Sequence, residues 1–138
     1  MDMSFFQPDN ENLIWVADAL NDNLKPRNFE RQFYHYKGQR WRVKDLYEAS
    51  KHLSVEWVPV ESLAEKPWKA FEQKSRMDVA RHIKLVLGAN LDFPILLSSN
   101  GRIMDGNHRI VKAYLLGNER IAVKQFKTDP PPLPSEDL

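Results

Sequence analysis

The stretch DFPILLSSNGRIMDGNHR, residues 92–109, decides how the rest of the chain can fold. Within it, Ile95–Leu97 is a short apolar run between a proline and turn-forming residues, which predicts a buried strand. Asn100-Gly101 favours a tight turn, because both residue types tolerate positive φ. Residues 102–104 are then expected to form the returning strand, and Gly106 interrupts the strand pattern. The stretch therefore predicts two strands joined by a tight turn and ended by a glycine.

A helix is expected to follow the glycine. From Ile110 onward the apolar residues recur at helical spacing, and Gly117 supplies a stop signal. Residues 105–109 thus lie where a strand passes into a helix N-terminus. At such a point the unpaired backbone N–H groups and the positive end of the helix dipole favour anions.

The residues of this turn fit two interpretations. In the first, Gly106 lets a phosphate approach the backbone closely. His108 then supplies a switchable donor, and Arg109 supplies a forked cation that suits phosphate oxygens. In the second, Asp105 and Asn107 only cap the helix, and His108 and Arg109 are solvated.

Composition bounds the remaining possibilities. The chain has 138 residues, 42% of them hydrophobic, with a mean hydropathy of -0.57, which indicates one ordinary globular domain. The net charge is only +1, whereas a dedicated nucleic-acid-binding domain is usually strongly basic. The absence of cysteine excludes disulfides and cysteine metal sites. No apolar run approaches the roughly 20 residues of a membrane span, and residues 1–12 are mostly polar. A cytoplasmic location and no membrane partner are therefore expected.

A longer pattern of motifs extends over residues 58–126. The pattern resembles the ParB/sulfiredoxin superfamily, which implies an α+β fold with a small mixed sheet surrounded by helices. In chain order its parts are a V-x-V-x-x-L strand at Val58–Leu63, a helix at Asp78–Leu87, a P-I-hydrophobic strand at Pro94–Leu97, the motif G-x-hydrophobic-x-D-G-x-H-R at Gly101–Arg109, and a final strand at Ile121–Phe126.

The branches of this superfamily differ at the glycine motif. ParB proteins have a G-E-R-R version and bind CTP, while sulfiredoxins place a catalytic cysteine before the His-Arg pair and use ATP. A free-serine kinase branch has D-G-H-H-R and transfers phosphate from a nucleotide. This chain has D-G-N-H-R at residues 105–109 and no cysteine, which excludes sulfiredoxin chemistry and most resembles the kinase branch.

The resemblance implies a nucleotide site at this turn. It implies ATP, ADP or CTP with Mg²⁺ as the ligand, held by Gly106, Asn107, His108 and Arg109. The activity would be phosphotransfer to a small hydroxyl-bearing acceptor, or nucleotide hydrolysis. The alternative is a ParB-type module, non-enzymatic or nuclease-like, that binds nucleic acid or a protein partner.

Three further residues are implied as parts of the site. A glutamate after the first core strand acts as base in the kinase branch, and Glu65 is the closest candidate by position, with Glu61 second. Either residue is otherwise a solvent-exposed carboxylate. Asp105 is a candidate Mg²⁺ ligand and catalytic residue, or else a cap of the glycine turn. His82 lies on the helix that borders the nucleotide pocket in related domains, and is expected there or on the surface.

The extent of the motif pattern and the composition on either side of it divide the expected domain into three parts. Residues 1–55 form an N-terminal extension, with helices at 13–20 and 44–53. Between them lies a hairpin whose aromatic and basic residues (Tyr34, His35, Tyr36, Arg40, Trp41, Arg42) form either a nucleic-acid surface or an ordinary amphipathic face. Residues 56–127 form the core, and 128–138 form a flexible proline-rich tail. The core helix at residues 78–87 is predicted to begin at Asp78 and to bury Val79, Ile83, Val86 and Leu87.

Overall fold

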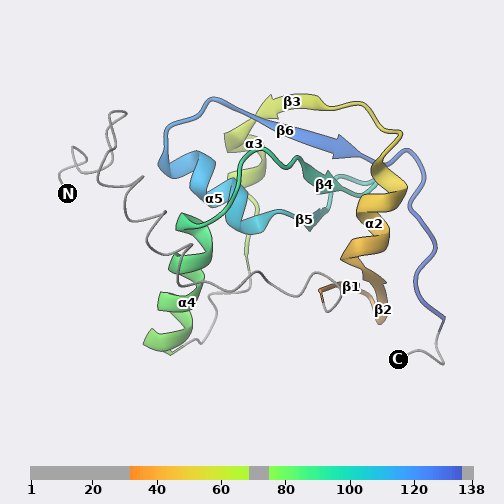
Figure 1. Ribbon diagram of the computed structural model, residues 1–138, viewed down its shortest axis with the longest axis horizontal. Coiled ribbons are helices and arrows are strands. Elements are labelled where there is room, and N and C mark those ends of the chain that lie inside the picture. The colour runs from red at the N-terminus through yellow and green to blue at the C-terminus, as the bar shows by residue number, and fades with distance from the viewer. Residues whose placement is uncertain (1–31, 69–74, 135–138) are drawn as a thin grey trace.

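The computed structural model describes residues 32–68 and 75–134, which adopt the predicted α+β class (Figure 1). These residues form four helices, a four-stranded sheet and a separate two-stranded hairpin. No helix among them is long and apolar enough to cross a membrane. The helix expected at residues 13–20 lies outside the described residues. In chain order the elements are β1 (Phe33–Tyr36), β2 (Gln39–Arg42), α2 (Val43–Ser50), β3 (Glu56–Pro59), α3 (Val60–Ala64), α4 (Arg76–Leu87), β4 (Ile95–Leu97), β5 (Ile103–Asp105), α5 (Asn107–Leu115) and β6 (Arg120–Gln125).

The four-stranded sheet is mixed, with strand order β3-β6-β4-β5. Strands β4 and β6 run parallel, whereas β3 pairs with β6, and β5 with β4, in antiparallel fashion. Strand β4 therefore has a neighbour on each side, and its residues Ile95, Leu96 and Leu97 are at most 6% exposed. Burial on both faces explains why this strand is an unbroken apolar run in the sequence.

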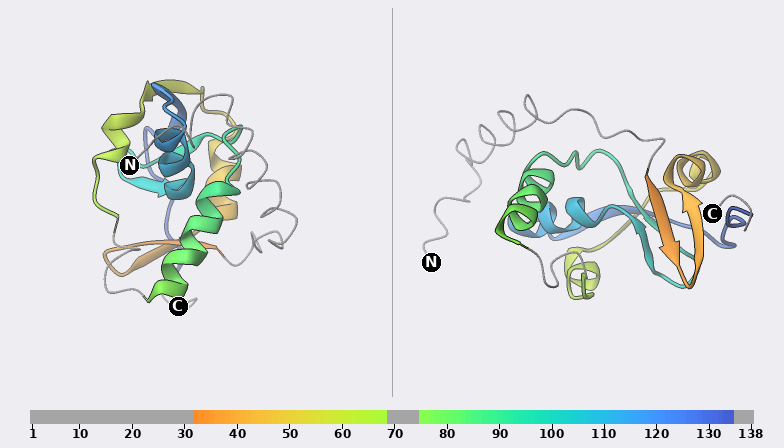
Figure 2. Two further views of the ribbon diagram at one scale, coloured as in Figure 1. Left: turned by 90° about the vertical axis from the view of Figure 1, so that its left-hand side faces the viewer. Right: turned by 90° about the horizontal axis from the view of Figure 1, so that it is seen from below.

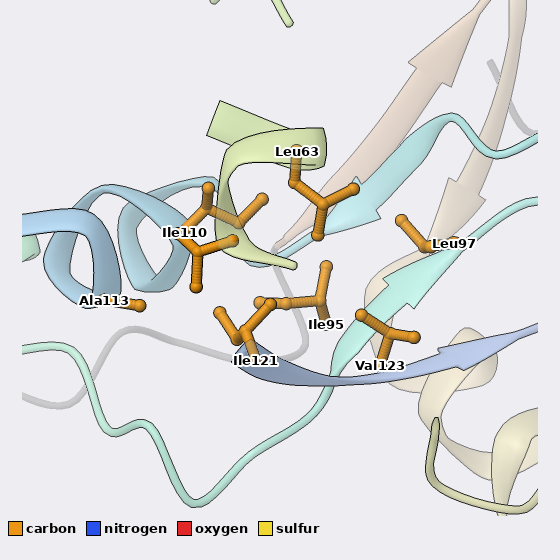
Figure 3. Close-up of a cluster of buried hydrophobic side chains, with 8 residues drawn as sticks. Leu63, Ile95, Leu97, Ile110, Ala113, Ile121 and Val123 are labelled. Carbon is orange, nitrogen blue, oxygen red and sulfur yellow. The ribbon is translucent and has the colours of Figure 1, made fainter. Parts of the chain in front are cut away.

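Strand β4 supplies side chains to two cores because successive residues of a strand point to opposite faces. On one face, Ile95 and Leu97 pack with residues of α3, α5 and β6 (Figure 3). On the other face, Leu96 packs with Trp41 of the hairpin and Leu46 of α2. Helix α4 packs against α5, away from α2 (Figures 1 and 2).

The strand, the tight turn, the returning strand and the glycine before a helix that residues 92–109 predict are confirmed, with the returning strand at residues 103–105 and not 102–104. Strand β4 is followed by a turn in which the Gly101 amide donates to the Ser98 carbonyl at 2.9 Å, and Gly101 has a φ of 81°. Strand β5 then returns beside β4, and α5 begins directly after Gly106. The turn residues and the apolar run explain this layout, because each acts through the conformational preferences of residues that are neighbours in the sequence.

The first core strand differs from the prediction. The strand ends at Pro59, and the rest of the V-x-V-x-x-L segment is the short helix α3. Val60 and Leu63 are 1% and 5% exposed. Residues three apart share a helix face but lie on opposite faces of a strand. A helical turn therefore buries both side chains in the same core, which a strand cannot do.

Helix α4 begins earlier than predicted. Ser75, not Asp78, is the N-cap: its side chain accepts from the Asp78 amide at 3.1 Å, and the Asp78 carboxylate accepts from the Ser75 amide at 3.4 Å, which is a capping box. The prediction that Ile83 is buried is wrong, since it is 50% exposed. The face turned toward α5 includes Val86 and half-buried His82, and Ile83 lies about 100° around the helix from His82.

The hairpin is confirmed, with β1 and β2 flanking Lys37-Gly38. The structure also shows a contact between the hairpin and the C-terminal residues, which the sequence did not predict. The Trp41 indole N–H donates to the Pro130 carbonyl at 2.8 Å, and the Leu133 amide donates to the Arg40 carbonyl at 2.8 Å. Residues 129–134, expected to belong to a flexible tail, therefore run along the edge of β2. They cover the Arg40 carbonyl, a backbone group that an edge strand would otherwise present.

Candidate functional site

The turn between β5 and α5 is built around Gly106, which has φ 115° and ψ 15° and is the N-cap of α5. A Cβ at this position would lie 2.5 Å from Cδ1 of Ile95. Both the positive φ and the close packing require glycine. The expectation that this glycine leaves room for a ligand is wrong on that side of the backbone, because Ile95 fills the space.

Arg109 lies inside the protein and not at its surface. It is 9% exposed, and its Nη1 donates to the carbonyls of Phe93 and Pro94 at 2.9 and 2.8 Å. Its Nη2 donates to Asp105 at 2.7 Å and to the Tyr47 hydroxyl at 2.6 Å. The guanidinium thus joins the segment before β4, the end of β5, and α2. The geometry makes Arg109 a brace of the turn and not a side chain extended toward solvent.

Asp105 is part of the same network. Its Oδ2 accepts from Arg109 and also from the Tyr47 hydroxyl at 2.5 Å. Burial, followed by the nearby Asp105 carboxylate, raises the pKa of Tyr47, so the phenol stays protonated and acts as donor to that carboxylate. Asp105 is therefore held in place by two donors, one from α5 and one from α2.

Metal binding at Asp105 has limited support from side chains. Within residues 32–68 and 75–134, no group of three or more His, Cys, Asp or Glu side chains is placed to hold a metal ion. Mg²⁺ is often held by one or two carboxylates together with substrate phosphates. The Mg²⁺ role of Asp105 therefore stays a prediction that depends on a bound nucleotide.

His82 and His108 meet beside the first turn of α5. Nδ1 of His82 lies 3.1 Å from Nε2 of His108, and the two ring planes are within 19° of each other. The Trp68 ring packs edge-on against both, with centroids 5.4 Å from His82 and 5.0 Å from His108. Both imidazoles are half-buried. Of the two interpretations of His82, the structure places it at the candidate site.

A cleft of about 420 Å³ lies along α3 and α5, and Glu61, Ala64, Glu65, Val111 and Tyr114 line it. Val111 and Tyr114 are three residues apart, so they are neighbours on the surface of α5. The cleft therefore lies between α3 and the part of α5 that follows His108. Both base candidates lie in it, and its volume is within the range of small-ligand pockets.

The structure adds two residues to the site, Tyr47 and Trp68, that the sequence did not indicate. Tyr47 is 58 residues from Asp105 in the chain, and its apolar neighbours predict only a core position. Trp68 follows Pro67, which indicates an anchored loop but gives no sign of contact with two histidines. Only the packing of α2 and of the loop after α3 brings these side chains to the turn.

Comparison of this chain with protein-family profiles, with curated proteins and with solved structures finds no match.

Proposed function

We propose that this chain has a ParB/sulfiredoxin-type fold and binds a nucleotide, or another phosphate-containing ligand, at the turn formed by residues 105–109. The observation that carries the proposal is the start of α5 at a glycine. Gly106 has no side chain to cap the helix, so no cap side chain accepts from the first-turn amides. Two imidazoles lie beside that turn. Phosphate oxygens are suitable acceptors for both kinds of donor.

The network behind the turn supports this assignment. Arg109 holds the backbone at Phe93 and Pro94 and the carboxylate of Asp105, so the turn is fixed before a ligand arrives. A preorganised set of donors loses little entropy on binding. Arg109 then acts on the ligand through the position of the turn, and the phosphate contacts come from the backbone amides and His108.

The fold part of the proposal is supported by the order of elements. Strand β3, helix α4, strands β4 and β5, helix α5 and strand β6 follow one another as the resemblance implies. The parallel pairing of β4 with β6 requires a crossover, and α5 supplies it. The finer ParB/sulfiredoxin assignment rests on this order and on the D-G-x-H-R motif.

The cleft supports an enzymatic version of the function. Glu61 and Glu65, the two candidate bases, line a cleft between α3 and α5, the helix whose first turn would hold the phosphate. A glutamate there would accept the proton of a hydroxyl-bearing acceptor in phosphotransfer, or of water in nucleotide hydrolysis. Most of the rate would come from positioning and from charge stabilisation by the amides, the imidazole and Mg²⁺ bound with the phosphates.

The second candidate, a nucleic-acid-binding module, is favoured by the hairpin. Residues 33–42 contain three cations, Lys37, Arg40 and Arg42, and no carboxylate. The guanidiniums of Arg40 and Arg42 lie over the Phe33 ring, at 4.5 and 5.5 Å from its centroid. Steeply salt-dependent binding of an oligonucleotide, weakened by Lys37→Ala, would favour this candidate.

A thermal-shift panel tests the leading proposal. The wild type and two variants, His108→Ala and His52→Ala, are heated with ATP, ADP, CTP or GTP, with and without Mg²⁺. Each shift is measured against the same variant without ligand, which removes any change in intrinsic stability. A ligand at 100 times its dissociation constant adds about 2.7 kcal/mol to the free energy of unfolding.

We expect at least one nucleotide to raise the melting temperature of the wild type and of His52→Ala, because His52 is exposed and lies outside the site. The shift should be much smaller in His108→Ala. Equal shifts in all three proteins would place the nucleotide elsewhere, and no shift with any nucleotide would overturn the proposal.

A further inference from the structure

Residues 129–134 lie against the β1–β2 hairpin and are joined to it by two hydrogen bonds. The indole N–H of Trp41 donates to the Pro130 carbonyl at 2.8 Å, and the Leu133 amide donates to the Arg40 carbonyl at 2.8 Å. Strand β1 pairs with the other edge of β2. The segment therefore occupies the edge of the hairpin where a further strand or a peptide could bind.

The contacts repeat at the spacing of a polyproline II helix, which has three residues per turn. Pro130 and Leu133, which bond to the hairpin, are three residues apart. Pro131 and Pro134, also three apart, are exposed. Each proline fixes its own φ near −65° and directs the residue before it toward an extended conformation. One edge of the segment is thus turned to the hairpin and another to solvent.

The hydrogen bonds of the two surfaces match. Proline has no backbone N–H, so the Leu133 amide is the one backbone donor that residues 130–134 possess, and the Arg40 carbonyl accepts from it. Trp41 is 6% exposed, so its indole N–H needs an acceptor from the protein or a ligand. No side chain of residues 130–134 takes part in either bond. A different segment with a proline and an amide at this spacing therefore presents the same groups.

An acidic residue fixes the direction of the segment. The Asp129 carboxylate accepts from the Ser99 amide at 2.7 Å and lies 3.7 Å from the guanidinium of Arg102. That guanidinium lies over the Tyr36 ring of the hairpin, 3.8 Å from its centroid. The carboxylate immediately before the first proline is thus held by the turn between β4 and β5.

We propose that Trp41 and the edge of β2 form a recognition site for a polyproline II segment of a partner protein, which residues 129–134 occupy as an internal competitor. The recognised pattern is an acidic residue, a proline, two further residues and a residue other than proline. The Tyr34 ring packs beside Trp41 with centroids 5.4 Å apart, and aromatic side chains are the usual lining of such sites. The site is separate from the phosphate site at the start of α5.

Two variants of the full chain separate the backbone bond from the leucine side chain. Leu133→Pro removes the single amide of residues 130–134, whereas Leu133→Ala keeps it. The indole ¹H–¹⁵N signal of Trp41, assigned by triple-resonance spectra, reports the contact with Pro130. We expect the signal to move in Leu133→Pro and to stay near its wild-type position in Leu133→Ala. An unmoved signal in Leu133→Pro would overturn the proposal.

Binding between molecules is measured with the capped peptide TDPPPLP, which has the sequence of residues 128–134. We expect it to bind the Leu133→Pro chain saturably and to return the Trp41 signal toward its wild-type position. The peptide TDPPPPP lacks the amide and should bind about tenfold more weakly. The wild-type chain should bind TDPPPLP at least about tenfold more weakly than Leu133→Pro, because its own segment competes as a tethered ligand.

Three results would overturn the proposal. If TDPPPLP at millimolar concentration does not bind Leu133→Pro, the contact is packing within one chain. If the two peptides bind equally well, the amide has no part in recognition. If the Trp41 signal of the wild type moves on dilution, the occupant is the same segment of a second copy.

Discussion

The guanidinium of Arg109 donates to the carboxylate of Asp105 at 2.7 Å, from the first turn of α5 to the last residue of β5. This contact spans the glycine that separates strand from helix, so the two residues on either side of Gly106 are held together. With the two carbonyls before β4 and the Tyr47 hydroxyl, Arg109 has four partners inside the protein. A buried network of charged and polar groups therefore holds the backbone of the candidate phosphate site in place.

Removal of Arg109 is expected to destabilise the fold strongly. Arg109→Ala leaves the carboxylate of Asp105 without its charged partner in a mostly buried place, and such a loss costs about 3–5 kcal/mol. Urea unfolding measures the change. The matched control is Arg81→Ala, which breaks an exposed Arg–Asp pair within helix α4. This substitution should lower the free energy of unfolding by about 1 kcal/mol or less. Equal losses in the two variants would contradict the bracing role of Arg109.

Tyr47→Phe tests the third member of the network. The substitution removes the hydroxyl that bonds to Asp105 and Arg109, and hydrogen bonds to charged groups contribute about 1.5–3 kcal/mol. The aromatic ring stays, so packing against the hairpin core is kept. A loss below a few tenths of a kcal/mol in urea unfolding would show that the network contributes little to stability.

The same residue gives a pH dependence. Because its pKa is raised in the folded state, folded Tyr47 holds its proton more tightly than the unfolded chain does. Its stabilisation is complete below the ordinary tyrosine pKa of about 10 and diminishes as the pH rises above it. The free energy of unfolding of Tyr47→Phe should therefore fall less steeply above pH 10 than that of the wild type. Parallel curves would rule out a raised pKa.

Gly106→Ala tests the need for glycine at the start of α5. The new Cβ would lie 2.5 Å from Ile95 at a position with positive φ. Positive φ costs a non-glycine residue about 1–2 kcal/mol, and overpacking adds about 1–3 kcal/mol. Gly117→Ala is the matched control, because Gly117 also has positive φ and a Cβ there would meet nothing within 4 Å. The difference between the two variants isolates the packing cost, and no difference would argue against the contact with Ile95.

Glu65→Gln tests the base role. If Glu65 accepts a proton in the reaction, the turnover of whichever nucleotide binds should fall about 10²–10⁴-fold, with the affinity for that nucleotide nearly unchanged. Glu61→Gln is the control in the same cleft, and it should affect turnover less. A reversed order would assign the base role to Glu61. Unchanged turnover in both variants would remove the glutamates from the mechanism.

Much of the fold could be predicted because its signals are local. The apolar run of β4, the turn at Gly101 and the glycine before α5 each depend on the conformational preferences of neighbouring residues, and all three agree with the structure. The start of α4 was misplaced because Ser75 and Asp78 are both good N-cap residues, and the capping box uses both. The sequence predicts a strand where α3 begins, because valine is also a strand former and Val60 continues the valine pattern of β3.

The site was less predictable because its partners are distant in the chain. The sequence places Arg109 at a helix N-terminus, where an arginine is usually solvated, and only tertiary packing turns it inward toward Phe93, Pro94 and Tyr47. The approach of His82 to His108 depends in the same way on how α4 packs against α5. The docked segment after Asp129 had no signal beyond its prolines, because its anchors are the Trp41 indole and a backbone carbonyl.

The most direct measurement of the central claim is an isothermal calorimetric titration of the full chain with ATP, ADP and CTP in the presence of Mg²⁺. Wild type and His52→Ala should bind at least one of them saturably at a single site, and His108→Ala should bind the same nucleotide about tenfold or more weakly, a loss of about 1.4 kcal/mol. Saturable binding that is identical in His108→Ala, or the absence of binding to a well-folded wild type, would contradict a phosphate site at the start of α5.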